Sequence, residues 1–521
     1  MQGKKQYTEK LFASFQLSER VPKHNFYRRL KQELDLNFLY KATHRYYGNE
    51  GQKSIDPVVF FKLLLVGYLE NLNSDRKIIE HCTMRLDILF FLGYDIDEEL
   101  PWHSTLSRTR QLYGEDVFLE LFKSVLSLCV SKGMVSGKRQ AIDSAYIKAN
   151  ASMDSVVEKQ ILEDAKTFAH ELTANDETVS TKKKKEVEAH HQWKTQAYKK
   201  QPQGRKKTSQ DTFDDERDED ENKRGKFMSN HTHYSTTDPD ARISTKPGKP
   251  RQLNYTAQTS VDTKQHVITN IMADYSSKRD SESLAQAVNK TINNLQQHQL
   301  KVKEILADTG YSSGSALRYL AFQKLTGYIP NFGQYKPLRE GFIYNAEKDQ
   351  YECVQAGGNK AVLPHKRTAA NSNGYVMRTY RSSEKVCKQC PLKRTCIGKS
   401  NFKKLDESID KPYYDQMHER MQTRKAKLYK KLRSSTVEPV LGTLINFMGM
   451  RRIWTRGIKQ ANKFMLCAAI AYNLKKWLNY QPKKLNAKAL TKQITDKLQK
   501  ELKTALNLIF KPHRLPYTLM V

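Results

Sequence analysis

The apolar positions of the chain change their spacing several times, and each change marks a new predicted element. From Asp56 to about Gly133, apolar residues recur at the three- and four-residue spacing of amphipathic helices. Short apolar runs bounded by turn residues follow at 139–149, 254–262, 266–274, 302–308 and 326–331, which is the pattern of strands. Helical spacing lies between them at about 281–295, after a cap at Asp280, and returns beyond residue 400.

The order strand, hairpin, helix, strand, helix, strand is typical of an RNase H-like sheet. We therefore predict an α/β fold with an RNase H-like catalytic core, a mixed five-stranded sheet with helices, plus an all-α N-terminal DNA-binding domain and two insertions. The expected parts are the all-α domain at 1–135, the first core strand at 136–152, a charged and partly disordered insertion at 153–249, the rest of the core sheet at 250–334, a cysteine-rich insertion at 335–400, C-terminal core helices at 401–480, and a basic helical tail at 481–521.

The charge of the chain narrows the choice of partner. Lys and Arg outnumber Asp and Glu by 89 to 56, which gives a net charge of +33. Such a balance favours nucleic acid, although ribosomal and membrane-surface proteins are also basic. The most apolar run, Val58 to Leu69, contains Lys62 and is shorter than the ~20 residues of a membrane span, so we predict a buried helix, no membrane and a cytoplasmic chain.

Three acidic residues stand in contexts that could form one site. Asp143 lies in the middle of the first predicted strand, and Asp308 ends a strand expected to be its parallel neighbour. Glu438 is predicted in the first turn of a helix that Ser435 or Thr436 caps and in which Pro439 is tolerated. Any one of these acids alone would more often be structural. Together they predict a Mg²⁺ (or Mn²⁺) site for phosphoryl transfer, which commonly uses two metal ions held by carboxylates.

Four of the seven cysteines fall in one segment. A CxxC pair and two further thiols, Cys353, Cys387, Cys390 and Cys396, are suited to structural Zn²⁺, with an iron–sulfur cluster or unliganded thiols as alternatives. Basic residues around them would make this segment a further DNA-contacting surface, namely Lys385, Lys388, Lys393 and Arg394. Cys82, Cys129 and Cys467 are predicted to be ordinary core residues.

A second basic feature lies in the N-terminal helices. The segment from Pro101 to Gly114 predicts a helix capped by Ser104 or Thr105, with Arg108 and Arg110 facing DNA. A solvated basic helix is the alternative.

Several of these segments resemble one known family. The stretches AIDSAYIKANAS, EILADTGYSS and RSSTVEPVLGTLINFMGMRR, with TRG beyond it, are similar to those of DDE insertion-sequence transposases with a Tyr-Arg-Glu-Lys type signature. DPVVFFKLLLVGYLENLNSDRKIIEH and LPWHSTLSRTR resemble the N-terminal domain of that family, so the likeness extends over about residues 20–480. It implies that Asp143, Asp308 and Glu438 are the catalytic, metal-binding carboxylates.

The resemblance also assigns DNA contacts. The Tyr and Arg of the signature fall on Tyr429 and Arg433, four residues apart on a helix expected to end before Thr436, where Arg433 would grip a phosphate. The Lys of the signature falls on Ile445, which cannot bind a phosphate. One of three arginines would have to replace it, namely Arg451, Arg452 or Arg456, and Trp454 among them would either stack on an extruded base or belong to the core.

Three functions remain open from the sequence. The first is a transposase that binds the terminal inverted repeats of its element, cleaves double-stranded DNA at the ends and joins them to target DNA. The second is a DNA-binding derivative that has lost catalysis, and the third is a metal-dependent nuclease without strand transfer. The family implies a homodimer or larger synaptic complex and a bacterial, nucleoid-associated location. The chain has no GxxxxGK[ST] motif, so ATP is not implied.

Overall fold

A computed structural model of the chain describes residue 5, residues 16–158 except 49, 51–53 and 73, residues 229–245 except 231, and residues 250–481 except 334, 372 and 373. Most of the charged insertion and the predicted basic tail therefore lie outside the described residues. The N-terminal part is helical, as predicted. Its elements are α1 (Leu17–Arg20), α2 (Phe26–Glu33), α3 (Phe38–Thr43), η1 (His44–Tyr46), α4 (Pro57–Leu69), α5 (Asp75–Thr83), α6 (Leu86–Leu92), α7 (His103–Leu112) and α8 (Glu115–Ser131).

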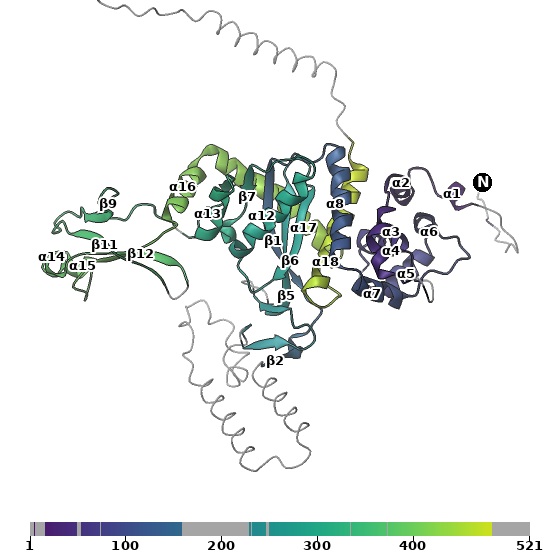
Figure 1. Ribbon diagram of the computed structural model, residues 1–521, viewed down its shortest axis with the longest axis horizontal. Helices are drawn as coiled ribbons and strands as arrows, with labels where there is room; N and C mark the ends of the chain where they lie inside the picture. The colour runs from purple at the N-terminus through teal and green to yellow at the C-terminus, as the bar shows by residue number, and fades with distance from the viewer. Residues whose placement is uncertain are drawn as a thin grey trace, which may run out of the picture. The chain divides into compact units, whose positions relative to one another are not determined.

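The central feature is a mixed sheet in which parallel and antiparallel strands meet (Figure 1). Its strands are β1 (Arg139–Lys148), β4 (Arg242–Ser244), β5 (Gln252–Asp262), β6 (Ile268–Tyr275), β7 (Glu304–Leu306) and β8 (Thr326–Tyr328). β1 pairs antiparallel with β5 and parallel with β7, and β7 pairs parallel with β8. The order β6-β5-β1-β7-β8 is the RNase H-like arrangement expected from the sequence.

The sheet has six strands, because part of the charged insertion joins it. Its last described residues form β4, which pairs with the start of β5, while β6 pairs with the rest of β5. A run of three residues is too short to stand out from a polar segment, so the prediction of five strands was wrong by one. Residues further back in the same insertion pair as β2 (Val156–Glu158) and β3 (His233–Ser235), after the single turn η2 (Met153–Ser155).

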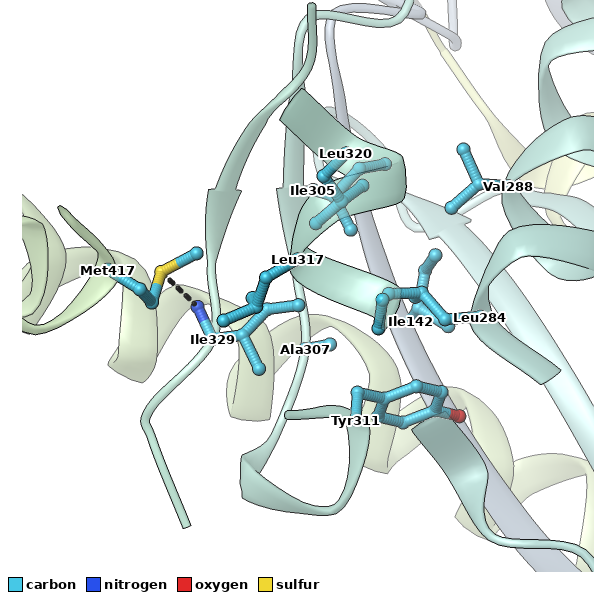
Figure 2. Close-up of a cluster of buried hydrophobic side chains, with 11 residues drawn as sticks. Ile142, Leu284, Val288, Ile305, Ala307, Tyr311, Leu317, Leu320, Ile329 and Met417 are labelled. Carbon is cyan, nitrogen blue, oxygen red and sulfur yellow. Dashed lines mark hydrogen bonds between the residues drawn. The ribbon is translucent and has the colours of Figure 1, made fainter. Parts of the chain in front are cut away.

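Helices cover both faces of the sheet. α12 (Asp280–Gln296), α13 (Gly314–Phe322) and α16 (Lys411–Gln422) enclose a core that includes Ile142 of β1 and Ile305 of β7 (Figure 2). Leu306, the next residue of β7, packs instead against α17 (Arg424–Phe447). Because successive strand residues face opposite sides, Asp143 lies on the α17 side while Ile142 anchors the strand in the core.

The edge of the sheet at β6 is protected by α18 (Ile458–Asn479). The Asn473 side chain donates to the Ile268 carbonyl at 2.9 Å and accepts from the Ile268 N–H at 3.0 Å, as a neighbouring strand would. The Asn462 side chain accepts from the Ala273 N–H at 2.8 Å. These contacts use backbone groups that an edge strand would otherwise leave open to another chain.

One helix differs from its prediction. The sequence indicated a helix that ends before Thr436 and another that begins there, but α17 is continuous over 24 residues with Pro439 inside it. Pro439 removes one backbone hydrogen bond, at a cost of ~3 kcal/mol. The helix contacts β1, β5, β7 and β8, and apolar residues on both sides of the proline are buried, which keeps the helix intact. These residues are Ala426, Tyr429, Val437, Val440, Leu441 and Leu444.

The cysteine-rich insertion forms a lobe of its own, with a five-stranded antiparallel sheet in the order β13-β12-β11-β10-β9. Its elements are β9 (Phe342–Asn345), β10 (Gln350–Cys353), β11 (Val362–Ala370), β12 (Val376–Arg381), α14 (Glu384–Lys388), α15 (Lys393–Cys396) and β13 (Lys404–Ser408). We call residues 342–408 the β-lobe. In the part of the chain that the structure describes, no helix is long and apolar enough to cross a membrane.

Candidate active site

Asp143 is held at the centre of the sheet. Its strand pairs with β5 on one side, where Thr259 lies opposite Asp143, and with β7 on the other side at residues 139–141, just before Asp143. Its carboxylate accepts a hydrogen bond from the Ser144 N–H at 2.8 Å, and only 16% of the side chain is exposed. Both strand neighbours therefore fix the backbone that carries this carboxylate.

Asp308 lies two residues beyond the end of β7, the parallel neighbour of β1, as the sequence predicted. It begins the single turn η4 (Thr309–Tyr311), where its carboxylate accepts from the Gly310 N–H at 3.0 Å. Burial and the negative charge of Asp280 raise the pKa of Asp308. Asp308 also lies close enough to Asp143 for its charge to raise the pKa of that residue.

Glu438 reaches the same place from α17. Arg433 donates to the Asp143 carboxylate at 2.8 Å and to the Glu438 carboxylate at 3.1 Å, so one guanidinium bridges the two acids. Arg433 is 13% exposed and Glu438 58% exposed, so the pair with Asp143 is the more shielded. The structure therefore brings together the three carboxylates that the sequence selected, with Arg433 as their shared cation.

Burial raises the pKa of Asp143 to about 6, against the lowering effects of the Ser144 N–H and of Arg433. A carboxyl held this far above its ordinary value is typical of sites whose charges are arranged for function.

A fourth acid escaped the sequence prediction. Asp280 was expected only to cap its helix, but it is the first residue of α12 and its carboxylate lies beside Asp308. A Cβ placed on Gly310 would lie 3.2 Å from the Asp308 carboxylate and 3.3 Å from that of Asp280. Gln258 of β5 donates to Asp280 at 3.0 Å and accepts from the Tyr311 hydroxyl at 2.5 Å. An Asp at a helix start is so common as a cap that its sequence carries no further signal.

The carboxylates have the donor chemistry that Mg²⁺ and Mn²⁺ require. As arranged, however, no three Asp, Glu, His or Cys side chains among the described residues are placed to hold a metal ion. Arg433 takes up one oxygen of Asp143 and one of Glu438. Both acids could bind the same cation only after Arg433 has moved aside.

Tyr429, predicted to contact DNA, is only 7% exposed. Its hydroxyl hydrogen-bonds with Arg139 of β1, whose guanidinium also lies over the Tyr429 ring. Arg139 is in turn paired with Glu304 of β7. Tyr429 therefore fastens α17 to the strands that carry Asp143 and Asp308.

The candidate contacts after α17 are more accessible. Arg451 and Arg456 are exposed, and Trp454 is 44% exposed, so the alternative of a core tryptophan is wrong. Arg452 lies over the Trp454 ring and donates to Asn150 at 3.2 Å. Ile445, at the position of the signature Lys, is half-buried on α17.

Trp454 and Arg456 line a cavity of about 720 Å³ together with Arg110 of α7. The Arg110 side chain is only 13% exposed, and Asp75 of α5 accepts from both of its terminal nitrogens, at 2.6 and 3.0 Å. Arg108 on the same helix is exposed. The prediction that both arginines face DNA is therefore corrected for Arg110, and the helix begins at His103 after Trp102 and not at a Ser104 or Thr105 cap.

The four clustered cysteines come together in the β-lobe. One small cavity is lined by Cys353 of β10, Cys387 of α14, Cys396 of α15, and Cys390, which lies between the two helices. All four are free thiols, and the hydroxyl of Ser382 donates to the Cys387 sulfur at 3.0 Å. Their convergence agrees with the prediction of a shared site, although their sulfurs are not arranged around a metal position. Cys82, Cys129 and Cys467 are buried core residues, as predicted.

Two family models match the chain. Residues 15–112 match "Transposase domain (DUF772)" and residues 356–478 match "Transposase DDE domain". The first range covers α1 to α7, and the second extends from the β-lobe through Glu438 to α18. No curated protein matches the chain. A solved structure described as a piggyBac transposase synaptic complex with hairpin DNA is weakly similar, with 11% identity and a TM-score of 0.30 over 95% of this chain and 86% of that one.

Proposed function

Since this chain belongs to the DDE insertion-sequence transposases, we propose that Asp143, Asp308 and Glu438 form its catalytic site for DNA cleavage and strand transfer. The substrates are the terminal inverted repeats of the element and a target duplex. The observation that carries the proposal is the bridge from Arg433 to Asp143 and Glu438, which joins a central strand to a helix that begins nearly 300 residues later in the chain.

Each group of residues at the site has a separate role. Two Mg²⁺ or Mn²⁺ ions held by the carboxylates would neutralise the phosphate and activate the attacking oxygen. Arg433 holds the acids together before the metal binds and, once released, is placed to donate to a nonbridging phosphate oxygen. Tyr429 and Arg139 keep α17 seated on the sheet, so that Glu438 stays opposite the two aspartates.

The test is cleavage and joining of labelled DNA carrying the ends of the element, with Mg²⁺ or Mn²⁺. The Asp143→Ala, Asp308→Ala and Glu438→Ala variants should each lose both activities and keep end binding. Glu419→Gln, at an exposed acid on α16, serves as the matched control and should cut and join normally.

The other outcomes distinguish the competing functions. Cutting without joining would favour the metal-dependent nuclease. A wild-type chain that binds ends but never cuts with either metal would move the inactive DNA-binding derivative to first place. We expect a dimer or larger complex to form on end DNA, which light scattering of the chain with and without that DNA would measure.

We further propose that the cysteine cavity binds structural Zn²⁺. The β-lobe has a small core, and small lobes are commonly stabilised by a metal. Binding requires the four sulfurs to close toward one point. Zinc in the purified full chain, present in wild type and absent from Cys390→Ser, supports the proposal, and Cys82→Ala is the control at a core thiol. Iron with visible absorption would indicate a cluster, and no metal at all would leave free thiols.

A further inference from the structure

We propose that the hairpin of β11 and β12 in the β-lobe is an arm that grips the phosphate backbone of duplex DNA beside the catalytic carboxylates. This inference rests on the proposed function, because the DNA is the duplex that enters that site. The arm consists of residues 362–381, of which 372 and 373 are not described. It is a different surface from the four basic residues that surround the cysteines.

The charge of this part of the lobe is strongly one-sided. Within residues 362–381 the arm has four cations, Lys366, Arg367, Arg378 and Arg381, and no acid. Arg381 pairs with Glu384, and Glu407 of β13, which lies opposite Arg378 in the sheet, accepts from the Tyr351 hydroxyl. Within the described residues no ion pair reaches Lys366, Arg367 or Arg378. Three cations without an ion pair on one ribbon favour a polyanionic partner.

The arm presents its cations to solvent. Lys366, Arg367 and Arg378 are exposed, as are all β11 residues from Lys366 to its end. The two strands keep these residues near one another, since Thr368 pairs with Arg378 and Arg367 pairs with Thr379. An extended two-stranded ribbon with cations along it can follow a phosphate backbone without reading its sequence.

The tip of the arm touches the core next to the active site. Arg279 donates to the Tyr375 hydroxyl at 3.1 Å, and Tyr375 comes directly before β12. Arg279 is followed by Asp280, whose carboxylate faces that of Asp308 across Gly310. A duplex whose scissile phosphate lies at the carboxylates would therefore have the arm beside it.

The placement also answers an electrostatic need. Asp308 lies close enough to Asp143 and to Asp280 for their charges to interact, and these carboxylates repel a phosphate until cations compensate. Cations on the arm offset this repulsion for the flanking phosphates. The arm is thus suited to holding duplex DNA near a site that would otherwise reject it.

The first experiment measures DNA affinity of the full chain over a series of salt concentrations, without divalent metal. The probe is a labelled duplex carrying the end of the element with flanking DNA. Lys366→Ala/Arg367→Ala should lower the slope of log affinity against log salt by about 0.9 for each lost phosphate contact. The control is Lys301→Ala/Lys303→Ala, at two exposed lysines before β7 and at the opposite end of that strand from Asp308; its slope should not change.

The second experiment places a photo-crosslinking residue at Thr368 or at Lys301. Only the Thr368 derivative should capture the duplex. An unchanged slope in the arm variant, or equal crosslinking from both positions, overturns the inference. If the arm variant is unstable to heat, Lys366→Gln/Arg367→Gln replaces it in the same test. Because both measurements need no cleavage, a chain that binds through the arm but never cuts would refute the proposed function and leave the arm intact.

Discussion

Arg433 donates to the Asp143 carboxylate at 2.8 Å, although 290 residues separate the two in sequence. The ion pair is shielded and links α17 to the first strand at the candidate active site. It sets the charge of the site before any cation arrives.

Replacing Arg433 by Ala should destabilise the metal-free chain by about 3 kcal/mol above pH 6, because it leaves the Asp143 carboxylate shielded and unpaired. Urea unfolding measures the change. Arg433→Lys, which keeps a charge but not the two-pronged geometry, should lose less stability. Added Mg²⁺ should restore part of the loss in Arg433→Ala. Equal stability of wild type and Arg433→Ala would show that the pair contributes nothing to folding.

Asp143→Asn should make the metal-free chain more stable than wild type above pH 6. Burial raises the pKa of Asp143 to about 6 in the folded chain, from 3.8. Between these values the folded state holds more protons than the unfolded state, so wild-type stability falls as pH rises. The cost is about 2–3 kcal/mol once both states are ionised. Comparing the two unfolding curves at several pH values should show the gap closing as pH falls from 6 to 4.

Gly310→Ala should impair cleavage while leaving the fold intact. The new Cβ would lie close to the carboxylates of Asp308 and Asp280, and displacing a catalytic group by less than 1 Å can cost on the order of 100-fold in rate. Gly442→Ala is the matched control on α17, since nothing lies within 4 Å of its added Cβ. That control should gain roughly 0.5–1 kcal/mol of stability and keep full activity. Similar rates for both variants would mean that the turn tolerates the shift.

Substitutions of Arg108 and Arg110 should affect different properties, DNA affinity for Arg108 and stability for Arg110. Arg110→Ala breaks the paired contact with Asp75 and should lower stability by about 3 kcal/mol, as seen in thermal or urea unfolding. Arg108→Ala removes an exposed cation and should leave stability unchanged within roughly 0.5 kcal/mol. We expect DNA affinity to fall in Arg108→Ala. A loss of stability in that variant instead would contradict the assignment of the two roles.

The sequence predicted the strand that carries Asp143 and the strand that precedes Asp308, because each is a short apolar run bounded by turn residues. It misplaced the helix around Glu438 because Pro439 and the polar run before it are local signals. Burial of Val437, Val440 and Leu441 overrides those signals, and this burial depends on tertiary packing that the local sequence does not contain.

The surroundings of the carboxylates could not be predicted for the same reason. Asp280 and Gln258 approach Asp308 only through the pairing of β5 with β1 and the position of α12. Nor does the sequence distinguish Arg108 from Arg110, since their different surroundings depend on where α5 packs. Residue identities therefore indicated the kind of chemistry at the site, and tertiary contacts decided which residues lie there.

The three carboxylates differ in how firmly the chain holds them. Asp143 belongs to a strand that pairs with β5 over nine residues and with β7 just before Asp143, so it moves only if the sheet opens. Asp308 sits in a single turn beyond its strand, and Glu438 projects from a helix toward solvent. The site thus has one anchored member and two that can adjust. Fraying of one turn would be enough to separate the carboxylates and abolish activity while the rest of the chain stays folded.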